Sequence, residues 1–215
     1  MRNRSSVLEL AVLGLLHSAP MHGYQLRKRL NEMLGMLRPF SYGSLYPCLK
    51  NLADQRLIAS SEETDTPGTS RRARIVYRLT ESGTAHLEAL LGQAGPATWE
   101  DENFDVRFAL FAQTDADTRL HILEGRRARM AERLDAINGA IRRGGPADTY
   151  TQELQRHTLE QVEREVHWLE GLIESERAAH RRTGSARLAL APPSEHLSSR
   201  IGLVTPAQPL PNTTK

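Results

Sequence analysis

Apolar residues recur at three- and four-residue intervals through most of this chain, which predicts a mostly α-helical protein. The first helical segment, residues 5–18, is apolar on nearly all sides and must therefore be buried on several of them. A second helix begins near His22 and turns its leucines inward, while Arg27, Lys28 and Arg29 stay on its solvated side.

The segment from Phe40 to Gln55 predicts a short helix with one apolar stripe, formed by Leu45, Leu49 and Leu52. Pro47 is tolerated in it only near the first turn, where the missing N–H has no intrahelical acceptor to lose. Polar groups gather at the start of this helix, a combination suited to phosphates and base edges. We interpret it as a recognition helix, with an ordinary amphipathic helix as the alternative. The outward residues expected to contact DNA are Ser41, Tyr42, Ser44, Tyr46 and Lys50.

Two short apolar segments, residues 57–63 and 73–80, follow the recognition helix and predict a β-hairpin. Arg71 and Arg72 at the end of the connecting loop, with Arg74 at the start of the second segment, place charge where a wing would reach a groove or the flanking phosphates. Three helices followed by a hairpin indicate a winged helix-turn-helix. A further helix starts at Thr80, and the DNA-binding domain is expected to span residues 1–95.

Aromatic residues cluster directly after this domain, with Phe104, Phe108 and Phe111 at helical spacing and Trp99 just upstream. They could form the wall of an effector pocket in which Arg107 meets an anionic group. The alternative, which we favour slightly, is that these aromatic residues simply join two domains.

The spacing changes to a heptad pattern in residues 115–141 and again in residues 148–181, with a Gly-Gly-Pro turn between the two segments. Arg127 occupies the polar position of the first stripe. Two such helices cannot bury their apolar stripes fully on each other, so residues 96–182 are expected to form a homodimer. The residues expected at the interface are Leu120, Leu123, Met130, Leu134, Ile137, Leu159, Val162, Val166, Trp168, Leu169 and Ile173. A twofold dimer predicts an operator that is an inverted repeat.

The rest of the chain adds few constraints. Residues 183–215 hold five of the eleven prolines, lack a sustained period and are predicted to be disordered. The longest apolar run, near residues 10–16, is too short to span a bilayer, and the N-terminus lacks signal-peptide features, so a cytoplasmic location is expected.

Charge is distributed unevenly along the chain. Residues 1–95 carry 12 Lys and Arg against 8 Asp and Glu, whereas residues 96–181 carry 12 against 17. A basic domain beside an acidic helical region is suited to binding double-stranded DNA. The common hydrolase, nucleotide-binding and zinc-protease motifs are missing from the sequence, so an enzyme is not expected. The histidines show no ligand spacing and the single cysteine, Cys48, lies among leucines, so no metal or cofactor is expected.

Three motifs make the chain resemble the PadR family of transcriptional regulators: MHGYQL at residues 21–26, SYGSLYPCLKNL at 41–52 and RIVYRLTESG at 74–83. The resemblance implies a dimeric winged helix-turn-helix repressor that is often released from DNA by a small molecule. Residues 96–181 are similar to the C-terminal helices of the longer members. The alternative is a winged-helix adaptor that binds only protein. Lys50 and the wing arginines argue against that alternative.

Overall fold

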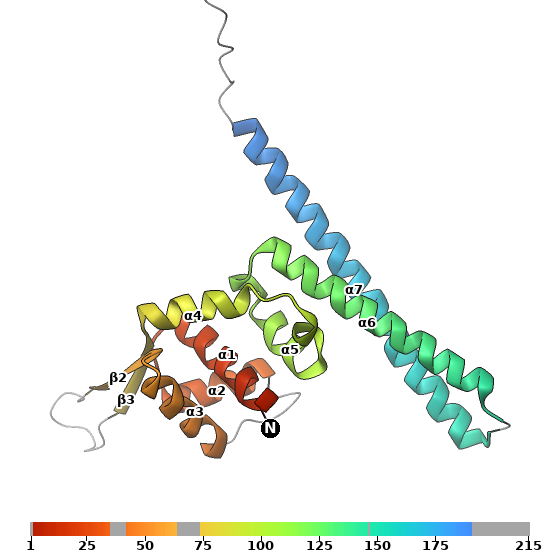
Figure 1. The fold of residues 1–215 in the computed structure, drawn as a ribbon, viewed down its shortest axis with the longest axis horizontal. Helices are drawn as coiled ribbons and strands as arrows, with labels where there is room; N and C mark the ends of the chain where they lie inside the picture. The colour runs from red at the N-terminus through yellow and green to blue at the C-terminus, as the bar shows by residue number, and fades with distance from the viewer. Residues whose placement is uncertain (1, 35–41, 64–73, 146, 191–215) are drawn as a thin grey trace, which may run out of the picture.

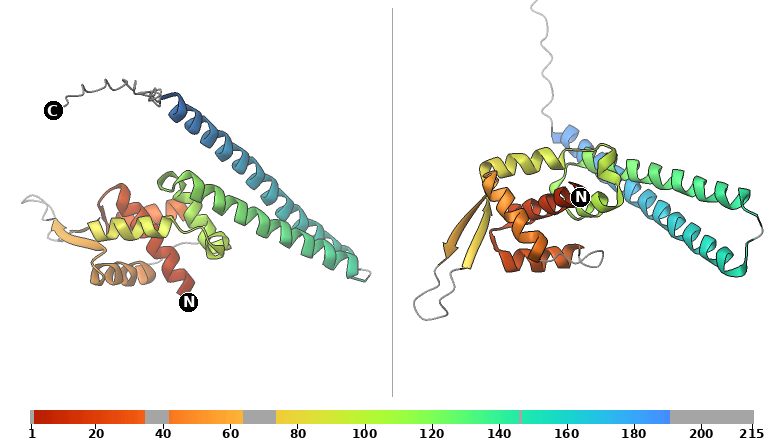
Figure 2. Two further views of the ribbon diagram at one scale, coloured as in Figure 1. Left: turned by 45° about the horizontal axis from the view of Figure 1, so that its top comes forward. Right: turned by 60° about the horizontal axis from the view of Figure 1, so that its bottom comes forward.

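A computed structural model of the chain describes residues 2–34, 42–63, 74–145 and 147–190. A rounded N-terminal part carries a hairpin at one edge, and a long pair of antiparallel helices extends away from it (Figure 1). The two further views in Figure 2 agree with this arrangement. It confirms the predicted fold class, a winged helix-turn-helix followed by long C-terminal helices. None of the described helices is long and apolar enough to cross a membrane.

The N-terminal part is built around the first helix. Leu8, Ala11, Val12 and Leu13 are all buried, so the expectation that this helix is covered on several sides is confirmed. The elements of this part are α1 (Arg2–Ser18), β1 (Met21–His22), α2 (Gly23–Leu34), α3 (Tyr42–Asp54), β2 (Ile58–Glu63), β3 (Arg74–Leu79) and α4 (Glu81–Leu91).

The predicted hairpin is present, with β2 and β3 antiparallel and Ile58 opposite Leu79. A third strand, β1, pairs with the other edge of β3 and places Met21 opposite Tyr77. The sequence did not predict β1, because two residues are too few to show an alternating pattern. This strand fixes the start of α2 against the sheet.

The start of α4 is tied to the end of α3 by Thr80. Its hydroxyl accepts a hydrogen bond from the backbone N–H of Gly83 at 3.0 Å, so Thr80 caps α4 as predicted. The same hydroxyl lies 2.8 Å from the carbonyl oxygen of Arg56. Gly83 lies so close to the backbone of Leu57 that a Cβ added to Gly83 would overlap the Leu57 carbonyl oxygen.

The second part of the chain begins with a connecting segment and ends with the helix pair. It comprises η1 (Pro96–Trp99), α5 (Asp101–Ala109), η2 (Phe111–Gln113), α6 (Ala116–Arg143) and α7 (Thr149–Leu190). Asp115 caps α6 by accepting a hydrogen bond from the N–H of Thr118 at 2.8 Å. Helix α7 continues to Leu190 instead of ending near Arg181. The first residues of the predicted tail are therefore helical, and residues 191–215 lie outside the described part.

Helix α5 contributes to two separate hydrophobic cores. Val106 and Leu110 belong to the N-terminal core, whereas Phe104 belongs to the core between α6 and α7. Leu110 lies directly against Gly14 of α1, and the ring of Trp99 lies against Gly125 of α6. Glycines at these two positions let the connecting segment approach both parts closely.

Substitution of Gly83 tests the close contact at the start of α4. We expect Gly83→Ala to lower the free energy of unfolding by about 1–3 kcal/mol, because the added methyl group must displace the Leu57 backbone. Gly171→Ala is the control, since a Cβ added to Gly171 in α7 would point into open space. That change should stabilise the protein by about 0.5–1 kcal/mol. Urea unfolding followed by circular dichroism measures both values, and a Gly83→Ala protein as stable as the wild type would contradict the packing.

Candidate nucleic-acid interface

Helix α3 has the buried stripe and the exposed polar face that the sequence predicts. Leu45, Leu49 and Leu52 are buried, with exposed fractions of at most 1%, whereas Ser44 and Lys50 are exposed. Pro47 differs from the expectation, because it lies in the second turn of the helix. It therefore removes a hydrogen bond to the carbonyl of Gly43. Since Gly43 is exposed at the end of the helix, water can reach that carbonyl and the cost is limited.

The C-terminus of α3 is closed by a Schellman motif. The N–H of Leu57 donates to the carbonyl of Leu52 at 2.9 Å, and the N–H of Arg56 donates to the carbonyl of Ala53 at 2.9 Å. Arg56 has φ of 61°, a left-handed conformation that normally favours glycine. Hydroxyls of Thr80 and Ser82 donate to its carbonyl oxygen, so this turn is held in place by α4.

Near its N-terminus, α3 is positioned by Tyr46. A Cβ on Gly23 would lie 3.3 Å from the Tyr46 hydroxyl, so the tyrosine ring rests on the first residue of α2. The Tyr46 phenol also lies close to Tyr77 of β3. Burial raises the pKa of Tyr77, and the neighbouring Tyr46 phenol raises it further. Tyr46 is nevertheless 47% exposed, so it faces both the sheet and solvent.

The predicted DNA-contacting residues fall into two groups. Ser44, Tyr46 and Lys50 are all exposed on α3, with Tyr46 and Lys50 four residues apart on one side of the helix and Ser44 on another side. The others lie outside the described residues, either entirely or by their side chains: Ser41, Tyr42, Arg71, Arg72 and Arg74. The arrangement presents hydroxyl, phenol and ammonium groups on a helix that is fixed at both ends, which is what reading a DNA groove requires.

Arg107, one candidate for meeting an anionic group, binds the end of α4. Its guanidinium donates to the carbonyl oxygens of Leu90 at 3.0 Å and Gln93 at 3.1 Å. The residue is only 7% exposed, and burial lowers the pKa of Arg107. These carbonyls are at the C-terminus of a helix, where a cation is favourable. Arg107 therefore joins α5 to the winged domain.

The predicted aromatic residues pack with one another and with α7. Phe108 lies with its ring centroid 5.8 Å from Phe104, 5.1 Å from Phe111 and 5.2 Å from Trp168. Trp99 packs apart from this group, against Gly125. The cluster thus packs α5 against α7, and both helices belong to the second part of the chain.

A buried arginine that the sequence did not single out lies at the centre of the second part. Arg126 is 7% exposed and donates to the carboxylates of Asp101 and Glu165, and to the carbonyl oxygen of Trp99 at 3.0 Å. Its guanidinium also lies 5.1 Å from the centre of the Phe104 ring. Burial favours a lower pKa, but the hydrogen bonds to Asp101 and Glu165 raise the pKa of Arg126.

Arg127 was expected at the polar position of the apolar stripe, and this was wrong. Arg127 is exposed and pairs with Glu170 at 2.7 Å. The helix places Arg126 inward because position 126 lies three residues after Leu123 and four before Met130, both of which are buried.

The residues expected at a dimer interface lie mainly between α6 and α7 of one chain. Five are buried there with exposed fractions of at most 6%: Leu123, Met130, Val162, Leu169 and Ile173. Partly buried around them are Leu120, Leu134, Ile137 and Val166, with Leu159 also half-buried. Trp168 differs, with 45% of its surface exposed. The large apolar side chains that α7 leaves most exposed are Tyr150 at 87% and Leu154 at 65%.

Cys48 is half-buried on α3, and burial together with the Glu9 carboxylate raises its pKa to about 12. A thiol with this pKa is neutral and a poor nucleophile at physiological pH. Among the described residues, no group of His, Cys, Asp and Glu is placed to hold a metal ion.

Arg126 and Arg127 form a matched pair for testing the buried network. We expect Arg126→Met to lower the free energy of unfolding by about 3 kcal/mol, because it leaves the Glu165 carboxylate and the Trp99 carbonyl without a partner. Arg127→Met should cost about 0–1 kcal/mol, since both partners of that ion pair are solvated. Thermal and urea unfolding give both values. Equal losses in the two variants would show that Arg126 carries no special share of the stability.

Residues 12–89 match the family described as "Transcriptional regulator PadR-like family". Over 177 residues the chain is 27% identical to the negative transcriptional regulator PadR of Bacillus subtilis (strain 168), covering 78% of this chain and 96% of that protein.

Solved structures similar to this chain include Bacillus subtilis PadR in complex with operator DNA, at TM-score 0.38 and 23% identity, covering 79% of this chain and 99% of that one. Bacillus subtilis PadR in complex with p-coumaric acid has TM-score 0.36 and 23% identity, covering 80% and 97%. A PadR family transcription regulator of Clostridium difficile R20291 has TM-score 0.34 and 24% identity, covering 39% and 81%. The sequence matches therefore show a domain of the PadR-like family of transcriptional regulators over residues 12–89.

Proposed function

We propose that this regulator is a dimeric repressor that reads an inverted-repeat operator with α3. The observation that carries the proposal is that Tyr46 and Lys50 share an exposed side of a helix whose two ends are fixed by packing, with Ser44 also exposed. Residues 1–95 would bind DNA, residues 96–182 would form the dimer, and the protein would act in the cytoplasm. No step requires a cofactor or enzymatic chemistry.

Arg71, Arg72 and Arg74 complete the proposed DNA surface. They follow β2 in sequence: Arg71 and Arg72 lie outside the described residues, and Arg74 is the first residue of β3, in the hairpin at the edge of the winged domain (Figure 1). Arginines here would contact phosphates beside the groove that α3 enters, and would contribute affinity for any sequence. Base edges would be read by α3 alone.

The proposed dimer uses the helix pair, but its contact differs from a simple coiled coil. The apolar stripe of α6 and α7 is already buried within one chain, so the surface available to a second chain is the flank of α7 that carries Tyr150, Leu154 and Trp168. These three residues share one side of the helix, since 14 and 18 residues correspond to nearly whole numbers of turns. An obligate dimer would bury more than about 2,000 Å².

In this proposal a small-molecule effector releases the repressor from DNA. Phe104, Phe108 and Phe111 would form the apolar wall of its pocket, and Trp99, which packs separately against Gly125, would lie beside it. Arg107 is unsuited to hold an anionic group there, because its guanidinium already binds two backbone carbonyls. An adaptor that binds only protein is the alternative function, and it predicts no affinity for DNA.

Lys50 and Arg71 test the DNA surface through two different signatures. Lys50→Ala should weaken binding at particular base pairs by about 1–3 kcal/mol, because it removes a donor to a base edge. Arg71→Ala should weaken binding to all sequences and lower the salt slope by about one. Arg142→Ala, at the exposed far end of α6, is the control of equal charge. Fluorescence anisotropy over a range of salt concentrations measures these effects. Unchanged operator affinity in a Lys50→Ala, Arg71→Ala double variant would reject this surface.

Leu154 and Gln152 test the dimer contact. Leu154→Glu should dissociate the dimer, because it places a charge in an apolar interface. Gln152→Glu should leave the dimer intact, since Gln152 is exposed on the opposite side of α7. Sedimentation equilibrium gives the mass of each variant, with circular dichroism to confirm folding. A fully dimeric Leu154→Glu protein would place the interface elsewhere.

A further inference from the structure

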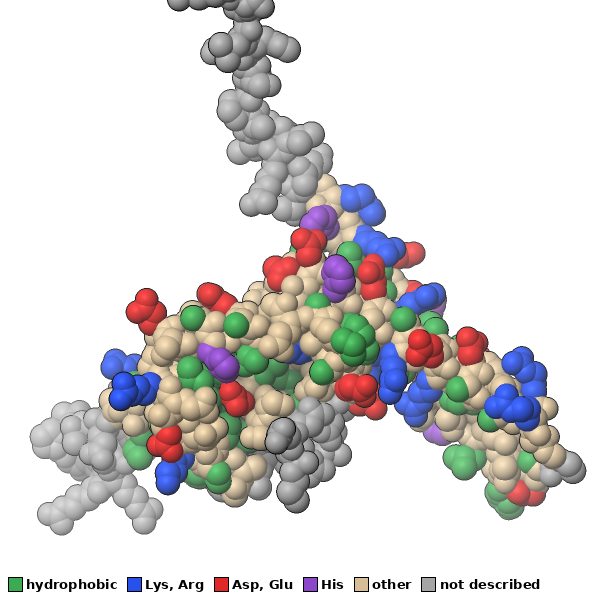
Figure 3. All heavy atoms as spheres, viewed as in Figure 1, with side chains coloured by type: hydrophobic (Ala, Val, Ile, Leu, Met, Phe, Trp, Pro, Cys, Tyr) green, Lys and Arg blue, Asp and Glu red, His purple; other side chains and the backbone are tan. Residues whose placement is uncertain are grey.

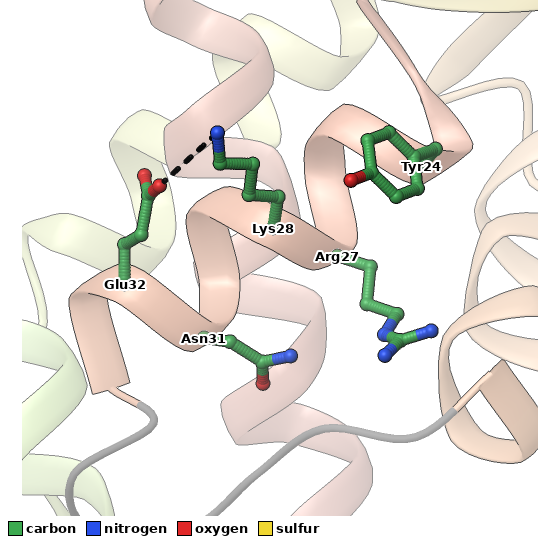
Figure 4. Close-up of a pocket in the computed structure, with 5 residues that line it drawn as sticks. All are labelled: Tyr24, Arg27, Lys28, Asn31 and Glu32. Carbon is green, nitrogen blue, oxygen red and sulfur yellow. Dashed lines mark ion pairs between the residues drawn. The ribbon is translucent and has the colours of Figure 1, made fainter.

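Charged side chains meet at several places outside the proposed DNA surface. One is a hollow of about 330 Å³ on α2, where the Lys28 ammonium group lies 3.8 Å from the Glu32 carboxylate (Figure 4). The side chains that line this hollow all come from one helix, and the ion pair is formed within that helix. Other pairs lie along α6 and α7, where acidic and basic groups are interspersed over the face that Figure 3 displays. Those pairs connect two helices, and one of them also reaches the joint with the winged domain.

That pair is formed by Arg119, near the start of α6. Its Nε and one terminal nitrogen donate to the Glu176 carboxylate of α7 at 3.1 and 2.9 Å. The other terminal nitrogen donates to the carbonyl oxygens of Phe111 at 3.3 Å and Thr114 at 2.7 Å. Phe111 begins η2, and Thr114 follows its last residue. One guanidinium therefore holds α7 and the end of the connecting segment at the same time.

The segment that Arg119 holds is itself attached to the winged domain. The side-chain amide of Gln113 in η2 donates to the carbonyl oxygen of Gly14 at 3.2 Å, and Leu110 lies directly against the same glycine. Gly14 belongs to α1, the helix around which the winged domain is built. Polar contacts thus run without a break from α7 through Arg119 and η2 to the centre of the winged domain.

The Arg119–Glu176 pair is better shielded from water than a neighbouring pair between the same helices. Its side chains are 22% and 25% exposed, whereas Arg177 and Glu124, which pair at 2.6 Å, are 52% and 40% exposed. Exposed ion pairs are weakened by water and salt, so the Arg119 pair is the stronger restraint. A planar guanidinium also needs its acceptors in fixed directions, so it restrains orientation as well as distance.

Two attachments give α7 a fixed direction. Arg126 binds α7 at Glu165 and also binds the start of the connecting segment. Arg119 binds α7 at Glu176, about 16 Å further along the helix. A helix held at one point can pivot about that point, whereas a second point fixes its direction. The apolar contacts between α6 and α7 have no preferred direction, so they oppose pivoting less.

We propose that the Arg119–Glu176 pair holds α7 at one angle to the winged domain and thereby sets the separation of the two recognition helices in the dimer. The proposal rests on the proposed function, in which the second chain binds the flank of α7. At a fixed angle, the two copies of α3 reach only half-sites at the matching separation. When the pair opens, α7 pivots and the dimer accepts half-sites at other separations.

Glu176→Gln and Glu124→Gln are matched variants, since each removes one carboxylate from an ion pair between α6 and α7. Fluorescence anisotropy of the full-length proteins measures binding to duplexes that carry two selected half-sites with spacers of different lengths. In Glu176→Gln, the ratio of affinities for the preferred and the altered spacer should fall about threefold or more. Glu124→Gln should keep the wild-type ratio. Affinity for a duplex with a single half-site should stay unchanged in both, which loss of folding would not allow.

Arg119→Lys is a second test of the same restraint. Lysine keeps the charge, but its compact ammonium group cannot hold the carboxylate and both carbonyl oxygens in the geometry of the guanidinium. The spacer preference should therefore weaken as it does in Glu176→Gln. A wild-type spacer preference in both variants would overturn the restraint while leaving DNA binding in place. A wild-type protein that binds none of the duplexes would overturn the proposed function as well.

Discussion

Two buried arginines set how the winged domain and the helix pair are joined. Arg107 of α5 holds the C-terminal carbonyls of α4, and Arg126 of α6 holds the segment around Asp101 together with Glu165 of α7. Apolar contacts have no preferred direction. A buried polar group that loses its hydrogen-bond partner, by contrast, lowers the stability of the folded protein. These contacts therefore fix the orientation of the joint. Helix α5 contributes to both cores.

A protonatable group lies beside the second arginine. Burial raises the pKa of Asp105, and the carboxylates of Asp101 and Glu165 raise it further against the opposing effect of Arg126. The raised pKa means that the ionised form of Asp105 is less favourable in the folded protein than in the unfolded chain. As the pH falls, Asp105 takes up a proton and its repulsion with Asp101 and Glu165 disappears. A carboxylate stabilised by an ion pair behaves in the opposite way, because protonation removes its favourable interaction.

The sequence predicted the elements that depend on local patterns. The stripe of α3, the hairpin and the Thr80 cap follow from spacing and from the chemistry of one or two residues. Strand β1 was missed because two residues show no alternating pattern. The inward position of Arg126 was missed although its spacing from Leu123 and Met130 places it on the buried side of α6. Tyr46 was predicted only as a DNA contact. Tyr46 also packs on Gly23. The sequence alone could not show this contact, because it does not show that α2 begins beside α3.

The central claim is that this surface reads a specific DNA sequence. Selection of duplexes from a random library, followed by competition between a selected and a scrambled duplex at 0.15 M salt, measures this most directly. The structure predicts that selected sequences share an inverted repeat and bind at least about a thousandfold more tightly than scrambled DNA. Equal affinity for both duplexes, or no enrichment at all, would contradict the account.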